Sequence, residues 1–255
     1  MSDKSKLLSR TGEWKVSKTG KQQTTGFDAV DDALATLISK AFDNVLLVEP
    51  RPVEKRFQSF LSRPAAERIY VGRFDSVIEC LKAIRRANAG QGRKPDDLQL
   101  NRDALPLINI SRSMDINYDN TDQQVDRRIG SSFSDPDDGR PLASLEFMQA
   151  IITYDVTIMA TDKDTLGLMC NSLGASIRLL MSTQFEANTK LVRVPVPLIC
   201  SLQDAKEIGF SDVSAPLAEE RIYAAQAPIS VLADVITAFE LDATRVVTET
   251  TLAVG

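Results

Sequence analysis

The stretch that decides the fold runs from residue 147 to residue 181 and reads FMQAIITYDVTIMATDKDTLGLMCNSLGASIRLLM. Its first part, Phe147 to Ala160, alternates as a β-strand does, and one face of it carries Ala150, Ile152, Tyr154, Val156 and Ile158. From Thr161 to Met181 the spacing becomes helical, and Thr161-x-x-Asp164 is a start signal that predicts Thr161 as the cap. An apolar stripe is formed by Leu166, Met169, Leu173, Ile177 and Leu180. We therefore expect a long central strand covered by an amphipathic helix.

Two glycines, Gly167 and Gly174, interrupt this helix one heptad apart. Each costs about 1 kcal/mol relative to alanine inside a helix. That cost predicts a close backbone approach at both positions, either to another subunit or in the packing of the helix on its own sheet. Both glycines are candidate interface residues.

Two more helices are predicted upstream, at 27–41 and 74–84, from apolar residues at helical spacing. A start signal Ser/Thr-x-x-Asp/Glu stands near the beginning of each, at Thr25 for the first and at Ser76 for the second. Between them, the apolar run from Val45 to Val48 predicts a short buried strand.

Three further strands are predicted, at 107–112, 191–199 and 222–239. Pro195 and Pro197 exclude a central, fully paired position for the second one, so we expect an edge or a bulge there. The third segment fits helical and strand spacing alike, and its β-branched residues favour the strand. The pattern as a whole predicts an α+β fold with a mainly antiparallel sheet covered by amphipathic helices.

The chain divides into a basic N-terminal arm, 1–26, and a single domain, 27–255, with an exposed acidic insertion at 115–140. The arm is expected either to be disordered or to dock on a neighbour, and Trp14, the only tryptophan, favours docking. Candidate interface residues outside the helix are therefore Trp14, Arg112, Asp135, Asp137 and Asp138.

Histidine is absent from all 255 residues, which excludes Ser-His-Asp, Cys-His and histidine–metal chemistry. Cys80, Cys170 and Cys200 are odd in number and far apart, so we expect reduced, buried thiols rather than disulfides. No apolar run is long enough to cross a membrane, and no signal peptide is predicted, so we expect a soluble product made in the cytoplasm. No cofactor is predicted, because phosphate-binding and hydrolase motifs are missing.

Two catalytic or metal-binding alternatives remain open. Asp115, Asn117, Asp119 and Asp126 match four ligand positions of a calcium loop, without its glycine and its terminal glutamate. This alternative predicts a small calcium-stabilised binding module. The other is a carboxylate-dependent metal nuclease that uses the segment 204–206 and a distant carboxylate, Asp137.

The order of elements resembles the tail terminator proteins in the neck of contractile-tailed bacteriophages. The stretches that carry the resemblance are Leu105–Arg112, Ile151–Ala160 and Asp162–Met169, over about half of the predicted core. The resemblance implies a non-enzymatic virion subunit that forms a hexameric ring, caps the tail tube and joins it to the head-side connector. Another neck component, such as a collar or adaptor protein, is the nearest alternative.

The implied partners are copies of the same chain, the tail tube and sheath proteins, and the connector. DNA would pass through the ring without sequence-specific binding, and the net charge of −5 suits such a lumen. The basic arm would then lie on the outer or connecting surface. No membrane contact is expected.

Overall fold

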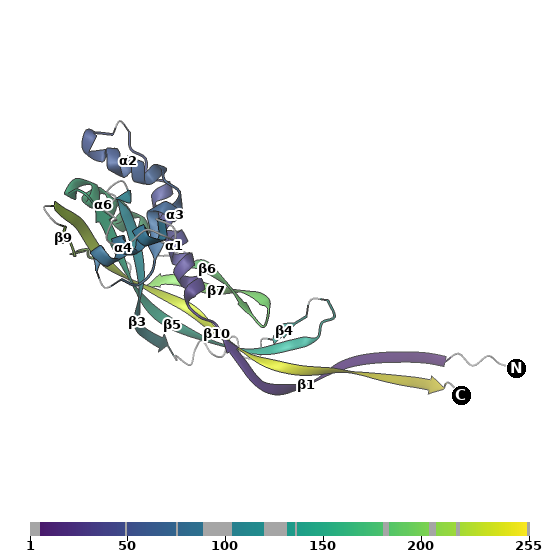
Figure 1. The fold of residues 1–255 in the computed structure, drawn as a ribbon. Coiled ribbons are helices and arrows are strands. Elements are labelled where there is room, and N and C mark those ends of the chain that lie inside the picture. Colours follow the sequence, from purple (N-terminus) through teal and green to yellow (C-terminus); the bar gives the residue numbers. More distant parts are fainter. Residues whose placement is uncertain are drawn as a thin grey trace.

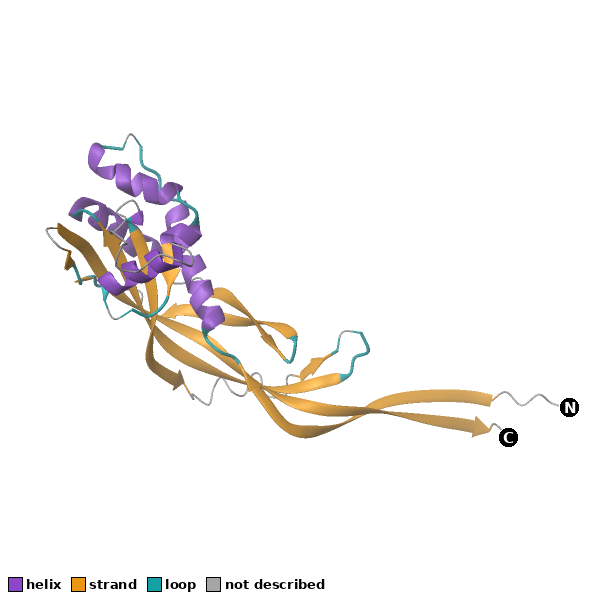
Figure 2. Cartoon of the chain, in the orientation of Figure 1, coloured by secondary structure: helices purple, strands orange, loops and turns teal. Residues whose placement is uncertain are grey.

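The computed structural model describes residues 6–48, 50–74, 76–88, 104–119, 132–135, 137–180, 184–203, 208–217 and 220–253 (Figures 1 and 2). The fold is α+β, as predicted, and its sheet is mostly antiparallel. The strands are β1 (Lys6–Thr24), β2 (Ile69–Val71), β3 (Leu107–Asp119), β4 (Ser132–Ser134), β5 (Pro141–Ala160), β6 (Gln184–Leu191), β7 (Val194–Gln203), β8 (Ser211–Asp212), β9 (Ala215–Leu217) and β10 (Glu220–Ala253). The helices are α1 (Asp28–Asp43), the 3-10 turn η1 (Pro52–Glu54), α2 (Lys55–Ser62), α3 (Ala65–Arg68), α4 (Val77–Asn88) and α6 (Lys163–Leu180).

Strand β5 is central, as the opening stretch predicts. The order across the sheet is β2-β3-β5-β10-β7-β6, so β5 pairs with β3 on one side and with β10 on the other. Pairing with β10 runs from Tyr223 opposite Ala160 to Glu240 opposite Ala143. The segment 222–239 is therefore strand and not helix, and the strand begins before the predicted Phe147, at Pro141.

The two faces of the sheet bury different helices. The alternating residues Ile152, Tyr154, Val156 and Ile158 of β5 pack in one core with α1 and α6. Met159 points to the other face, where it lies in a smaller core with Val77 and Cys80 of α4. The alternation of a strand produces this division, because successive side chains point to opposite faces.

The predicted helix starts are only partly confirmed. The hydroxyl of Ser76 accepts a hydrogen bond from the Glu79 N–H at 3.2 Å, as the start signal predicts. For α6, however, the cap is Asp162 rather than Thr161, and its carboxylate accepts the Thr165 N–H at 2.7 Å. Thr25 does not cap α1 either, because its backbone N–H and its hydroxyl both bond to Ile236 of β10.

The predicted strand at Val45 to Val48 is wrong. This segment is irregular, with Val45 and Leu47 packed against the core, while Leu46 and Val48 are exposed by 81% and 78%. A run of four apolar residues forms a strand only where a partner strand is available, and none pairs with this segment in the described part of the chain.

The prolines of the segment 191–199 lie in β7, next to the edge strand β6. Pro195 and Pro197 stand opposite Lys190 and Asn188 of β6, and β7 pairs with β10 only over residues 200–203. Over the described residues, the proline half of β7 thus has a strand partner on one side only, which agrees with the predicted exclusion from a fully paired position. The predicted insertion at 115–140 begins inside β3, which extends to Asp119, and ends in the turn before β5.

Candidate assembly surface

The N-terminal segment predicted as an arm is strand β1 over residues 6–24. It pairs antiparallel with the second half of β10, from Lys6 opposite Ala253 to Lys18 opposite Leu241. The pairing of β10 with β5 ends at Glu240, so residues 6–18 and 241–253 form a two-stranded ribbon that leaves the body (Figure 1). Lys6 and Ala253, the first and last described residues, pair at its far end. One of the two ribbon strands, residues 241–253, therefore belongs to the segment 27–255 that was predicted as the domain, and not to the predicted arm.

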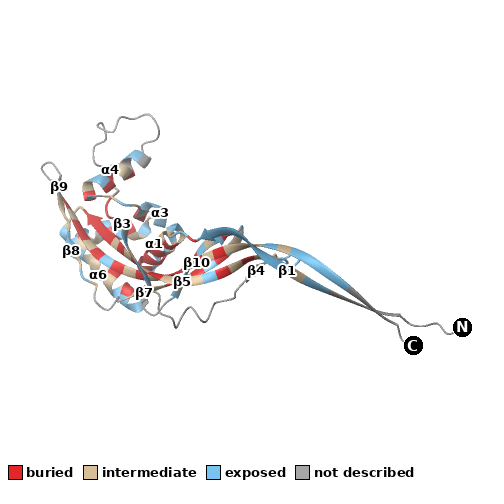
Figure 3. Ribbon diagram, turned by 90° about the horizontal axis from the view of Figure 1, so that it is seen from below, coloured by how far each residue is buried: buried red, intermediate tan, exposed pale blue. Residues whose placement is uncertain are grey.

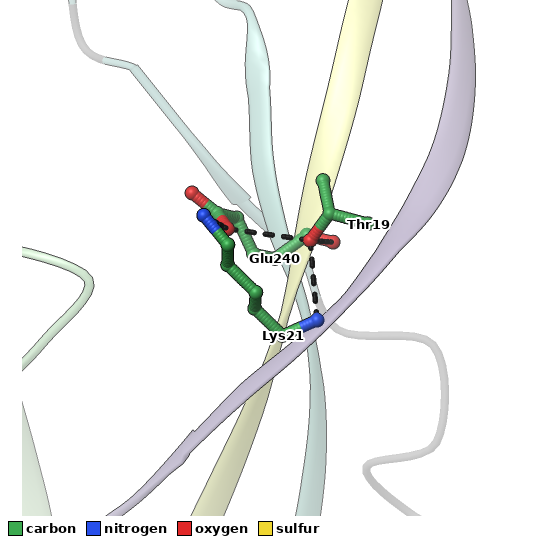
Figure 4. A network of polar contacts seen from close by, with 3 residues as sticks. All are labelled: Thr19, Lys21 and Glu240. Atoms are coloured by element: carbon green, nitrogen blue, oxygen red, sulfur yellow. Dashed lines mark hydrogen bonds and ion pairs between the residues drawn. The ribbon is translucent and has the colours of Figure 1, made fainter.

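A bulge marks the point where the ribbon leaves the body. Lys18 stands opposite Leu241 and Gln22 opposite Phe239, so three residues of β1 face the single residue Glu240. The hydroxyl of Thr19 lies 3.2 Å from both the carbonyl and the carboxylate of Glu240, and it accepts the Lys21 N–H at 3.3 Å (Figure 4). Extra residues on one strand increase its local bend and twist. The network holds this bend in place.

The ribbon has one apolar and one polar face. Period-two alternation in the paired strands puts one set of side chains on the first face, namely Trp14, Val16, Leu241, Ala243 and Val247. We call this set the apolar ribbon face; Lys18 and Arg245 lie on the same side, and the Arg245 guanidinium lies 6.0 Å from the centre of the Trp14 ring. The opposite face is mostly polar and carries Glu13, Lys15, Ser17, Asp242, Thr244 and Val246.

The apolar ribbon face is open to solvent within the chain. Val16 is 48% exposed and Val247 is 53% exposed, and Trp14 is only half-buried. Figure 3 shows mostly exposed residues along β1 where it leaves the body. An isolated two-stranded ribbon is marginally stable in water, because it has no core of its own. Complete burial of a valine side chain contributes on the order of 1.5–3 kcal/mol, so covering the exposed half of Val16 or Val247 contributes roughly half of that. Over the described residues, the ribbon strands pair with each other and with no third strand, so the backbone groups along their outer edges can form hydrogen bonds with a partner.

Arg112, a candidate interface residue, is engaged inside the chain. Its guanidinium lies 3.1 Å from the carboxylate of Asp31, which also accepts the Tyr154 hydroxyl at 2.7 Å. These contacts tie α1 to β3 and β5. Burial raises the pKa of Asp31, although its bonds to Tyr154 and Arg112 act in the opposite direction.

Asp135, Asp137 and Asp138 lie in the turn between β4 and β5. The Asp135 carboxylate accepts the Asp137 N–H at 3.0 Å, and the Asp138 carboxylate accepts the Arg140 N–H at 2.8 Å. Their turn-forming role is thus visible within the chain. Asp137 and Asp138 are exposed, so their side chains remain accessible to a partner.

Among the described residues, no backbone lies close to Gly167 or Gly174. A methyl group added at Gly167 would meet nothing within 4 Å, and one at Gly174 would lie 3.8 Å from the Phe210 ring, an ordinary contact. The prediction that packing on the sheet requires these glycines is therefore wrong. A contact with another subunit at Gly167 stays a prediction.

The calcium candidates Asp115, Asn117 and Asp119 lie on the extended strand β3, where alternate residues follow one another along a line instead of wrapping round an ion. Asp126 lies outside the described residues. Within the described ranges, no three His, Cys, Asp or Glu side chains are grouped as a metal site requires. The nuclease candidates at 204–206 also lie outside these ranges, and Asp137 is in the turn before β5.

All three cysteines are free thiols, as predicted. Cys80 and Cys200 are buried and Cys170 is half-buried. Burial raises the pKa of Cys80 and Cys200 to about 12 and that of Cys170 to about 11. The thiols are therefore protonated near neutral pH, when they are weak nucleophiles.

Sequence analysis missed the apolar ribbon face. A signal for it was present, because residues 13–18 alternate as Glu-Trp-Lys-Val-Ser-Lys. The partner strand alternates less clearly, since Val246 and Val247 are adjacent. Only the register shows that Trp14 and Val247 share a face.

No protein-family model matches this chain, and no curated protein sequence is significantly similar to it. Among the described helices, none combines the length and the apolar character needed to span a membrane.

Proposed function

We propose that this chain is a structural subunit of a phage neck, which forms a ring that ends the tail tube and joins the tail to the head-side connector. The observation that carries the proposal is the ribbon with its apolar face. A surface of this kind is stabilised only when a partner covers it, and a subunit of a permanent assembly always has that partner. The resemblance in the order of elements to tail terminator proteins supports the choice of assembly.

In this proposal the chain is one domain whose N-terminal strand, together with the end of β10, acts as a docking arm. The ring is hexameric, contains no cofactor and performs no catalysis; it is assembled in the host cytoplasm and retained in the virion. Its partners are the tail tube and sheath proteins and the connector. The ribbon lies on an outer or connecting surface, because its basic strand β1 would hold DNA if it lined the lumen.

The test begins with the mass and shape of the purified full-length chain. We expect light scattering to give about six times the chain mass of 28.0 kDa, and negative-stain images to show closed rings. Isolated phage tail tubes incubated with the protein should carry it at one end only. A chain that remains monomeric at high concentration, or that binds tubes along their whole length, would overturn the proposal.

Two neighbouring valines provide a matched pair of variants. Val247 belongs to the apolar ribbon face and Val246 to the opposite face, and their exposed fractions are similar, 53% and 46%. We expect Val247→Asp to reduce ring formation strongly, while Val246→Asp, with the same cost in strand propensity, leaves it largely intact. Equal effects of the two substitutions would contradict a docking role for this face.

A further inference from the structure

A groove runs between helix α1 and the edge strand β6. Its volume is about 760 Å³, and apolar side chains of both elements form its floor, namely Ala29, Ala33, Leu37 and Phe185. Phe185 packs against the same core as α1, because odd-numbered residues of β6 point to that face. Even-numbered residues of β6, such as Glu186 and Asn188, alternate to the other side and are exposed, and at this edge of the sheet they also border the groove.

The backbone of β6 is also open. Strand β6 is at the end of the sheet order, and over the described residues its only strand partner is β7. The N–H and C=O groups on the outer side of such an edge can receive another strand, which extends the sheet by main-chain hydrogen bonds. The groove thus lies beside a free pairing edge.

The charges at this groove are mainly negative. Asp32 and Glu186 line it against one lining cation, Lys40. Asp28, at the start of α1, lies 3.8 Å from Arg112, and Lys190, on β6, is a second exposed cation. Strand β1 of the ribbon is basic, with Lys15 and Lys18 exposed. Opposite charges on two separate surfaces of the same chain favour contact between copies.

We propose that strand β1 of one subunit adds to the β6 edge of the next subunit and covers the α1–β6 groove. Trp14 and Val16 then lie over the apolar floor, and Lys18, on the same face of β1, lies beside Asp32. Lys15 points to the opposite face, where it meets Glu186. These contacts can form together because side chains alternate along both β1 and β6. The mainly apolar face of each strand lies on the groove side of the extended sheet, and the polar face of each lies on the other side.

This contact joins two different surfaces, so it repeats head to tail and can close into a ring. The inference rests on the proposed function in that both require self-assembly. It adds which surfaces meet, and it predicts that the sheet continues from one subunit into the next.

Disulfide trapping tests the contact in the full-length chain. Ser17 lies on the same face of β1 as Lys15, and Asn188 lies on the same face of β6 as Glu186, and both are exposed. Two single variants, Ser17→Cys and Asn188→Cys, are mixed and oxidised, so that a link between positions 17 and 188 forms only between different molecules. We expect a covalent dimer on a non-reducing gel, and a ladder of higher species from the double variant.

The matched control replaces Asn188→Cys by Glu67→Cys, an exposed position on α3 that does not line the groove. This mixture should give no comparable dimer. Charge exchange provides the second readout: Lys15→Glu should raise the concentration needed for assembly several-fold, and Glu186→Lys in the same chain should restore it. This rescue should weaken as salt is added.

The outcomes separate the two proposals. Rings without a link between positions 17 and 188, and without charge rescue, would overturn the β1–β6 contact and leave the neck-ring proposal standing. A trapped dimer in particles that do not bind tail tubes would support the contact and contradict the neck role. A chain that is monomeric under all conditions overturns both.

Discussion

At the scale of single residues, the most informative contact is the one that joins α1 to the sheet. Asp31 accepts hydrogen bonds from Tyr154 and Arg112, and Tyr154 is completely buried. Tyr154 was expected as part of the apolar stripe of the central strand, and this is confirmed. Its hydrogen-bond partner could not be predicted, because Asp31 lies 123 residues away in the chain.

The first prediction concerns this bond. Tyr154→Phe removes the hydroxyl that donates to the partly buried Asp31 carboxylate, and we expect the free energy of unfolding to fall by about 1–2 kcal/mol. Urea denaturation followed by circular dichroism measures the change. Tyr118→Phe, at a side chain that is 50% exposed, serves as the control and should stay close to the parent protein. Equal midpoints for both variants and the parent would contradict a stabilising role for the bond.

At the scale of elements, periodicity predicted the helices α1, α4 and α6 and the strands β3, β5, β7 and β10, but not the short helices α2 and α3 or the edge strand β6. The ends of the predicted elements depended on contacts. Asp162, one residue after the predicted Thr161, caps α6 because its carboxylate reaches the Thr165 N–H. Thr25 does not cap α1, because its hydroxyl accepts a hydrogen bond from the Ile236 N–H of β10 instead. Local patterns thus indicate that a helix begins nearby, and competing hydrogen bonds decide at which residue it begins.

The second prediction belongs to helix α6. Because a methyl group at Gly167 meets no atom within 4 Å, Gly167→Ala should raise the free energy of unfolding by about 0.5–1 kcal/mol. Thermal unfolding should show a higher midpoint. Gly139→Ala should have the opposite effect, because Gly139 has a φ of +70°, which alanine adopts only with strain. The midpoint of thermal unfolding of this variant should therefore fall.

Assembly of the Gly167→Ala variant then tests the role of this glycine between subunits. A more stable chain that assembles less well would place Gly167 at a contact between copies. Unchanged assembly would remove Gly167 from the interface candidates.

At the scale of the whole molecule, the structure separates into a body with two cores and a ribbon without one. Figures 1 and 3 show the ribbon extending beyond the helices, with mostly exposed residues along it. Its two strands come from opposite ends of the chain, so no local pattern in either strand indicates the other. The described apolar cores of the body include no residue from 6–18 or from 241–253.

The third prediction follows from this separation. Removal of residues 1–18 and 243–255 together should leave the body folded, because both cores are retained, while self-assembly is lost. Circular dichroism and light scattering measure the two properties on the same sample. Removal of one strand alone should cause aggregation, since it leaves the other strand with two unpaired edges. A truncated body that still forms rings would contradict the docking role of the ribbon.

The amino-acid sequence by itself determined the α+β class, the central strand with its covering helix, and the reduced thiols. These features follow from the spacing of apolar residues and from composition, which act over a few residues at a time. Only the tertiary structure decided that β1 pairs with β10, that Arg112 forms an ion pair with Asp31 inside the chain, and that Trp14 and Val247 share one exposed face. Register between distant strands sets these relations, because it depends on the fit of whole surfaces rather than on any local preference.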